Sequence, residues 1–247
     1  MRRQLGLLAL FHLIANALIL WLGYYWLGVN ESETSTLLWS GFIAIVLIAG
    51  TCCAYGASLV FFGERGSART VGAWRTAARN LGPLVLAALV GGLLYWLLSR
   101  VTFQNAAFRV ASWMTLTLRK PVKAASVLRV FNGAFWLVQW MVIPVIVLPV
   151  IAAIARFGWK GFRALGRGMR VWRTWIVVPV LLACAFLLPP RIVRWVPEVD
   201  GFWAQSASFV ARAGVAYLLF GAAWLLLAFM TPRGKPEVTQ PSTVVSP

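Results

Sequence analysis

Six long apolar runs constrain the fold of this chain more strongly than any other feature of its sequence. An α-helix needs about 20 apolar residues to cross roughly 30 Å of hydrocarbon, and most of the runs are near that length or longer. The sequence therefore predicts an all-α, polytopic integral membrane protein with about six transmembrane helices. The predicted spans cover residues 5–27, 37–62, 83–98, 131–155, 174–190 and 206–230.

The composition supports this prediction and argues against an ordinary soluble domain. The 247 residues are 61% hydrophobic and 12% charged, whereas soluble domains are typically about half apolar and a quarter charged. The net charge of +17 comes from cations that lie between apolar runs and beside tryptophans, a pattern typical of membrane proteins with basic cytoplasmic loops. Membrane lipids with anionic headgroups are therefore the expected partners, with another membrane protein as a further candidate. A nucleic-acid partner is not expected.

The most basic connection, residues 155–175, separates the fourth and fifth apolar runs. On α-helical spacing, five of its cations share one side, opposite Phe162, Met169 and Trp172. This pattern predicts a basic amphipathic helix at the membrane interface that binds anionic headgroups. The alternative is a solvated cytoplasmic loop that carries only the topology signal. The predicted headgroup-binding cations are Arg156, Lys160, Arg163, Arg167 and Arg170.

The distribution of charge also predicts the orientation of the spans. A second basic amphipathic segment, residues 63–82, joins the second and third runs, and its Arg75 and Arg79 fall opposite Trp74. Cytoplasmic loops are rich in Lys and Arg, so we expect both basic segments and both termini in the cytoplasm. The Arg-rich inner loops and the absence of organelle signals favour a bacterial inner membrane.

The chain is expected to contain one folded unit. Residues 1–231 are predicted to form a single transmembrane helical domain. Residues 232–247 are rich in Pro, Ser, Thr and Val and show no apolar periodicity, which predicts a disordered cytoplasmic tail.

Residues 99–130 fit this topology less well than the rest. They follow the third run and should lie outside, yet they carry six cations and no acid. We expect a surface helix that ends before Pro121. The alternative is a weak span over residues 101–118 followed by a re-entrant segment over residues 131–155. Arg109 at mid-depth would make that span costly, so we prefer the surface helix.

Three polar residues inside the apolar runs are candidates for an intramembrane polar site. His12 and Asn16 are four residues apart in the first run and share a helix face. Gln139 lies in the fourth run, which Pro144 and Pro149 are expected to kink. Each of the three could make a structural hydrogen bond to another helix, or could line a cavity with a functional role.

Several kinds of chemistry are missing from the sequence. All six acids lie outside the apolar runs, so no span offers a carboxylate for proton-coupled or cation-coupled transport. The three cysteines lie within apolar runs and show no zinc spacing, so neither a metal nor another cofactor is expected. No hydrolase or nucleotide-binding motif is present.

These observations favour a non-catalytic structural or accessory component of the membrane, or one that binds anionic lipid. A carrier or channel for an anionic or lipid-like solute is the second hypothesis, and a lipid-modifying enzyme is the third. A cavity that reaches mid-bilayer with converging polar groups would favour the carrier. A nucleophile within hydrogen-bond reach of His12 would favour the enzyme.

Overall fold

The computed structural model describes residues 2–30, 32–63, 70–164, 172–197 and 201–231. In these ranges the chain is helical, with no strand, and six helical stretches are long and apolar enough to cross a membrane. The prediction of an all-α chain with six such helices is therefore confirmed.

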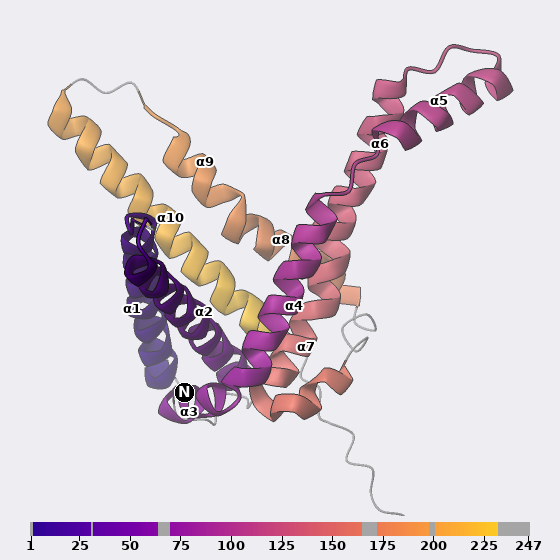
Figure 1. Cartoon of the computed structure of the whole chain (residues 1–247). Coiled ribbons are helices and arrows are strands. Elements are labelled where there is room, and N and C mark those ends of the chain that lie inside the picture. The colour runs from indigo at the N-terminus through magenta and orange to yellow at the C-terminus, as the bar shows by residue number, and fades with distance from the viewer. Residues whose placement is uncertain (1, 31, 64–69, 165–171, 198–200, 232–247) are drawn as a thin grey trace, which may run out of the picture.

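The helices run back and forth along the molecule, so that consecutive long helices are antiparallel neighbours (Figure 1). Short elements join them at both ends of the molecule. In chain order the elements are α1 (Arg2–Leu27), α2 (Thr34–Gly63), α3 (Thr70–Arg79), α4 (Leu81–Ser99), α5 (Gln104–Leu118), α6 (Ala124–Leu137), the π-helix η1 (Val138–Val142), α7 (Ile143–Phe157), the 3₁₀-helix η2 (Gly158–Ala164), α8 (Trp172–Phe186), α9 (Leu188–Arg194) and α10 (Phe202–Met230).

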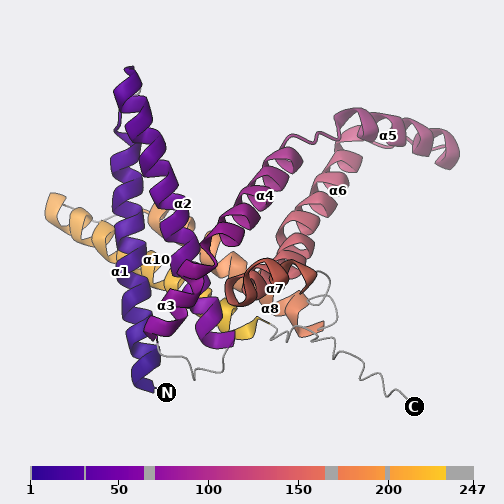
Figure 2. The same ribbon diagram turned by 60° about the horizontal axis from the view of Figure 1, so that its bottom comes forward.

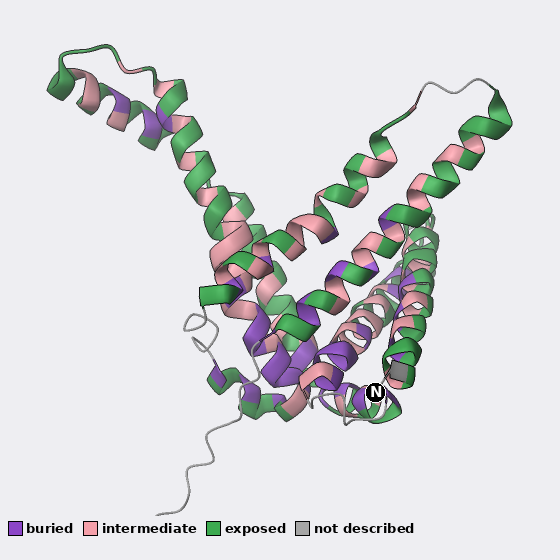
Figure 3. Cartoon of the chain, turned by 180° about the vertical axis from the view of Figure 1, so that it is seen from behind, coloured by how far each residue is buried: buried purple, intermediate pink, exposed green. Residues whose placement is uncertain are grey.

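The helices converge at one end of the molecule and diverge toward the other (Figures 1 and 2). The convergent end holds the start of α1, all of α3 and η2, and the end of α10. Buried residues are concentrated there, whereas the far ends of the helices are largely exposed (Figure 3). The buried apolar core comes mainly from α2, α7 and α10, and includes Leu59, Phe61, Val145, Ile154, Ala155 and Leu227.

Small residues let the core helices approach closely. The second half of α2 buries Ala54, Gly56 and Ala57, as its small-residue pattern suggests. A Cβ atom on Gly56 would lie 3.0 Å from a methyl carbon of Leu84, the first apolar residue after the proline of α4. Bulkier side chains at these positions would force α2 away from α4 and α7.

The fourth apolar stretch is longer than predicted and includes a π-helical segment. α6, η1 and α7 form one uninterrupted helical run of 14, 5 and 15 residues. Pro144 has no N–H to donate. Just before it, the backbone hydrogen bonds change from the i→i−4 spacing of an α-helix to i→i−5 spacing, and the Ile143 amide donates to the carbonyl of Val138. The run is about 50 Å long at 1.5 Å per residue, so its ends lie far apart. A re-entrant segment must turn back on itself, so this uninterrupted run argues against the re-entrant alternative for residues 131–155.

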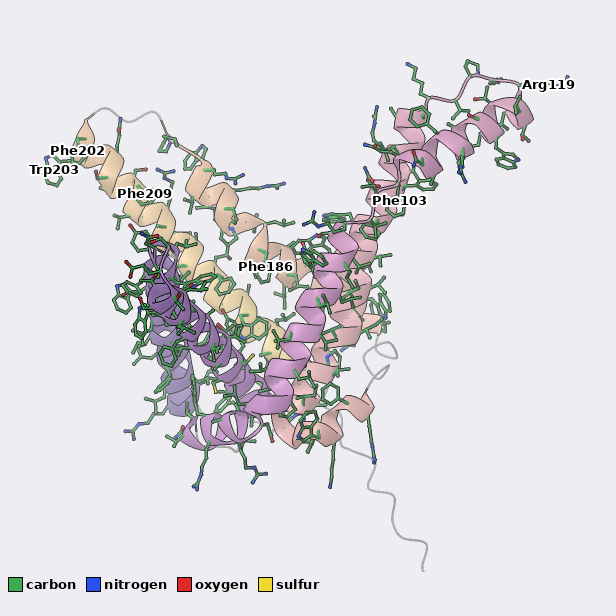
Figure 4. All side chains as sticks on the ribbon, in the orientation of Figure 1. Phe103, Arg119, Phe186, Phe202, Trp203 and Phe209 are labelled. Atoms are coloured by element: carbon green, nitrogen blue, oxygen red, sulfur yellow. The ribbon has the colours of Figure 1, made fainter. Side chains whose placement is uncertain are left out.

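α5 and the first part of α6 form a helical hairpin that projects from the divergent end of the molecule. The predicted helix before Pro121 is present, and its apolar face packs on α6, burying Ala107 and Ala111 against Val127. Arg119 takes a left-handed conformation at the far tip of the hairpin, with φ of 51° (Figure 4). The apolar face predicted for a surface helix is thus largely used for a protein contact.

Candidate functional site

The 3₁₀-helix η2 presents three different stripes, because side chains three residues apart lie on the same side of a 3₁₀-helix. One stripe is buried against α7 and consists of Gly158, Gly161 and Ala164. The second is aromatic: the exposed rings of Trp159 and Phe162 stack with their centroids 6.0 Å apart. The third is cationic and consists of Lys160 and Arg163, both exposed.

Glycine is required at two positions for η2 to fold back on α7. Gly158 ends α7 with φ of +59°, a left-handed conformation that residues with a side chain rarely adopt. Gly161 approaches the backbone of α7 so closely that a Cβ atom would lie 2.3 Å from the nitrogen of Ile154. Asn80, at the corner between α3 and α4, donates from Nδ2 to the carbonyl of Ala155 over 2.9 Å and holds this turn from the other side.

This turn corrects the prediction of one amphipathic α-helix over residues 155–175. In the described part of that segment, the α-helix ends at Phe157 and the chain reverses into η2. The cations that were predicted to share one helix face are therefore divided between α7 and η2. Arg156 is half-buried and donates from Nε to the carbonyl of Ala152, with its side chain against Gly63. Arg167 and Arg170 lie outside the described residues.

The predicted amphipathic face of the second basic segment is present in α3. Ala73 and Ala77 are fully buried against the protein, and Arg75 and Arg79 are exposed. The start of α3 is joined to the start of α1, because the Thr70 hydroxyl donates to Oε1 of Gln4 over 3.1 Å. Nitrogen-tipped side chains extend outward from α3 and η2 (Figure 4). We call this part of the molecule the basic end; its exposed cations include Arg3, Arg75, Arg79, Lys160 and Arg163.

His12 and Asn16 come together with residues of α2 and α10 in a buried polar cluster. Asn16 accepts at Oδ1 a hydrogen bond of 2.9 Å from the Tyr55 hydroxyl, and the His12 ring packs edge-on against the Tyr55 ring, with centroids 5.1 Å apart. Trp224 donates from Nε1 to the Ser58 hydroxyl over 2.9 Å, and its ring packs edge-on against the Tyr55 ring, with centroids 4.6 Å apart. The predicted polar contact between helices is thus present.

Two atoms of this cluster remain without a hydrogen-bond partner within the described ranges: Nε2 of His12 and Nδ2 of Asn16. Both residues are almost fully buried, at 2% and 3% exposure. A buried polar group left unpaired costs about 1–3 kcal/mol. Such a cost suggests that a group outside the described residues supplies a partner for at least one of the two atoms.

Gln139 does not join His12 and Asn16, so the three residues do not form one site. It lines a separate cavity of about 430 Å³ between α4, α7, α8 and α10, which we call the α4 cavity. Trp224 lines this cavity and also contacts Tyr55, so its indole separates the two polar regions. The position of Gln139 in the π-helical segment is notable, because π-bulges occur frequently at functional sites.

Asn16 and Tyr55 also line a cavity of about 540 Å³, between α1, α2, α9 and α10. We call it the α9 cavity. Tyr217 and Arg194 complete its polar lining. The Tyr217 hydroxyl donates to the carbonyl of Leu13.

The described residues contain no group of three His, Cys, Asp or Glu side chains that could hold a metal ion. Nε2 of His12 has no bonded nucleophile in the part of the chain that the structure describes. The arrangement can donate hydrogen bonds and attract anions, and it offers apolar surface to a lipid chain.

Comparison of the chain with protein-family models, curated protein sequences and solved structures found no match.

Two features of these sites were not predicted from the sequence. The period of three in Gly158-Trp159-Lys160-Gly161-Phe162-Arg163-Ala164 is a signal for a 3₁₀-helix that α-helical projection conceals. Tyr55 and Tyr217 are ordinary membrane-helix residues in sequence, and only the packing of α2 and α10 around α1 brings them to Asn16.

Proposed function

We propose that the protein is a non-catalytic, multi-pass component of a bacterial inner membrane that binds anionic lipid headgroups at its basic end. In this arrangement both termini, α3 and η2 are cytoplasmic, and the α5–α6 hairpin lies outside. The cytoplasmic leaflet is rich in anionic lipid, and Lys and Arg beside a span favour that side.

One observation carries this proposal: η2 presents Lys160 and Arg163 on one stripe and Trp159 and Phe162 on the next. Cations bind phosphate oxygens, and aromatic rings favour the boundary between headgroups and chains. Arg75 and Arg79 of α3 add two further exposed cations to the same end.

The test is binding of phosphatidylglycerol to the full-length protein in detergent, measured by native mass spectrometry with phosphatidylcholine as the reference. Each cation near an anionic surface contributes roughly 1 kcal/mol, so Lys160→Gln with Arg163→Gln should weaken binding about 30-fold. The matched control, Lys160→Arg with Arg163→Lys, keeps both charges and should bind as the parent does. Equal binding by the Gln variant, or equal loss in both variants, would contradict the proposal.

A carrier for an anionic or lipid-like solute is the second candidate function. The α4 and α9 cavities favour it, because they place Gln139 and Asn16 beside open cavities between the helices. A lipid-modifying enzyme is the weakest candidate, since in the described residues no hydroxyl or thiol is hydrogen-bonded to Nε2 of His12.

A further inference from the structure

The α9 cavity lies beside α9, a short helix that follows α8 after a single residue, Leu187. α8 ends at Phe186 and α9 begins at Leu188, followed directly by Pro189 and Pro190, which line the cavity. α9 packs against α10, where the small residues Ala213 and Ala216 leave space beneath it. A volume of about 540 Å³ is within the range of sites for small organic ligands.

Arg212 fixes α9 in this position. Its guanidinium donates from Nη1 to the carbonyl of Val193 over 2.7 Å and also to the carbonyl of Trp195. The carbonyls at the end of a helix have no amide donor within the helix, and here Arg212 supplies the donor. The wall of the cavity is therefore held by a side chain of α10, and does not depend on the ligand.

The polar groups of the cavity lie toward its two ends. Along α10 its lining runs from Ala213 to Phe220, about 10 Å at 1.5 Å per residue. Arg194 follows directly after Val193, whose carbonyl Arg212 binds, and is exposed. Asn16 and Tyr55 belong to the other end, because Tyr55 packs against Phe220.

Asn16 is the observation that points to a ligand. Its side chain is fixed by the Tyr55 hydroxyl at Oδ1, while Nδ2, also buried, has no acceptor among the described residues. Neighbouring atoms cover Nδ2 in this structure, so an acceptor oxygen from a bound molecule would satisfy it after a small shift of these neighbours. Among the described residues that line the cavity, Arg194 carries a charge and none is a carboxylate, so the charge of the ligand should be negative.

We propose that the α9 cavity binds one anionic phospholipid. Its phosphate pairs with Arg194, an ester carbonyl a few bonds away accepts from Nδ2 of Asn16, and the start of one acyl chain packs on Ile19, Leu20 and Val193. The polar lining of this site comes from Asn16, Tyr55, Arg194 and Tyr217, none of which belongs to the basic end, and a single lipid is held by shape and hydrogen bonds as well as by charge.

The experiment is titration of delipidated, full-length protein with phosphatidylglycerol in 1 M ammonium acetate, followed by native mass spectrometry. At this ionic strength the Debye length is about 3 Å, so lipid held only by exposed cations at the basic end is lost. The parent should retain one lipid per chain. Arg194→Gln should weaken binding at least about tenfold, because it removes a hydrogen bond between charged groups.

Asn16→Leu combined with Tyr55→Phe should weaken binding similarly. Replacing both partners of a buried hydrogen bond by apolar groups is nearly neutral for folding, so the melting temperature without lipid should stay close to that of the parent. Ala216→Phe fills the cavity and should abolish the bound lipid. The matched controls are Arg191→Gln, on α9 outside the cavity, and Gln139→Leu, in the α4 cavity; both should bind as the parent does.

Two further ligands test which parts of the phospholipid the α9 cavity recognises. Diacylglycerol should bind at least about tenfold more weakly than phosphatidylglycerol, since it has the same ester carbonyls and acyl chains but no phosphate for Arg194. Inorganic phosphate at millimolar concentration should not displace the lipid, because it has no chain to fill the cavity. Parent-like affinity in Arg194→Gln, in Asn16→Leu with Tyr55→Phe, or in Ala216→Phe would overturn the proposal, as would equal affinity for diacylglycerol.

Discussion

Gly161 shows how one missing side chain determines the shape of the basic end. The backbone of η2 contacts the backbone of α7 at this position, and no rearrangement of a flexible side chain could make room for a methyl group. The consequence extends to the surface, because the period of three turns Lys160 and Arg163 outward only while Gly161 faces inward.

Gly161→Ala should therefore destabilise the protein. Overpacking a close contact typically costs about 1–3 kcal/mol, and here the neighbour is backbone. The matched control is Gly72→Ala: Gly72 is exposed in α3, and a methyl group added there would meet no neighbouring atom within 4 Å. Ala favours a helix by up to about 1 kcal/mol over Gly, so this control should be neutral or slightly stabilising. Thermal unfolding in detergent measures both, and equal melting temperatures would refute the close approach.

At the scale of elements, the sequence predicts the long helices better than it predicts the turns between them and the residues at which helices begin. All six apolar stretches are helical because their composition alone demands it. The start of α6 at Ala124 was missed, since the extra turns project beyond the apolar run and are stabilised by α5. The reversal at Gly158 was missed because it depends on Asn80, which is distant in sequence.

Arg212 is the clearest case of an element held by a distant side chain. We expect Arg212→Gln to loosen α9 from α10, because the carbonyls of Val193 and Trp195 lose their donor. Hydrogen exchange of the amides in α9 should rise, while exchange in α1 and α2 stays unchanged. Arg191→Gln serves as the control, since Arg191 is exposed on α9. Unchanged exchange in Arg212→Gln would show that packing alone holds α9.

At the scale of the whole molecule, the six stretches and the basic end support the arrangement of the chain across a bilayer that we propose. The grouping of the polar residues into sites was harder to predict than the spans, because a site depends on which helices pack against one another. His12 and Asn16 share a helix face, as expected, but Gln139 belongs to another cavity. Its helix faces α4 and α8, and the indole of Trp224 stands between the two regions.

The most direct test of this arrangement is the sidedness of single cysteines. Cys52, Cys53 and Cys184 are first replaced by Ala, and one cysteine is then introduced in place of Lys160, Arg75 or Lys120, each of which is exposed. A membrane-impermeant maleimide is applied to intact cells and to inside-out vesicles. Cysteine at Lys160 or Arg75 should react only in inside-out vesicles, and cysteine at Lys120 only in intact cells. Reaction of Lys120 and Lys160 positions from the same side would contradict the six-span arrangement and the basic end that follows from it.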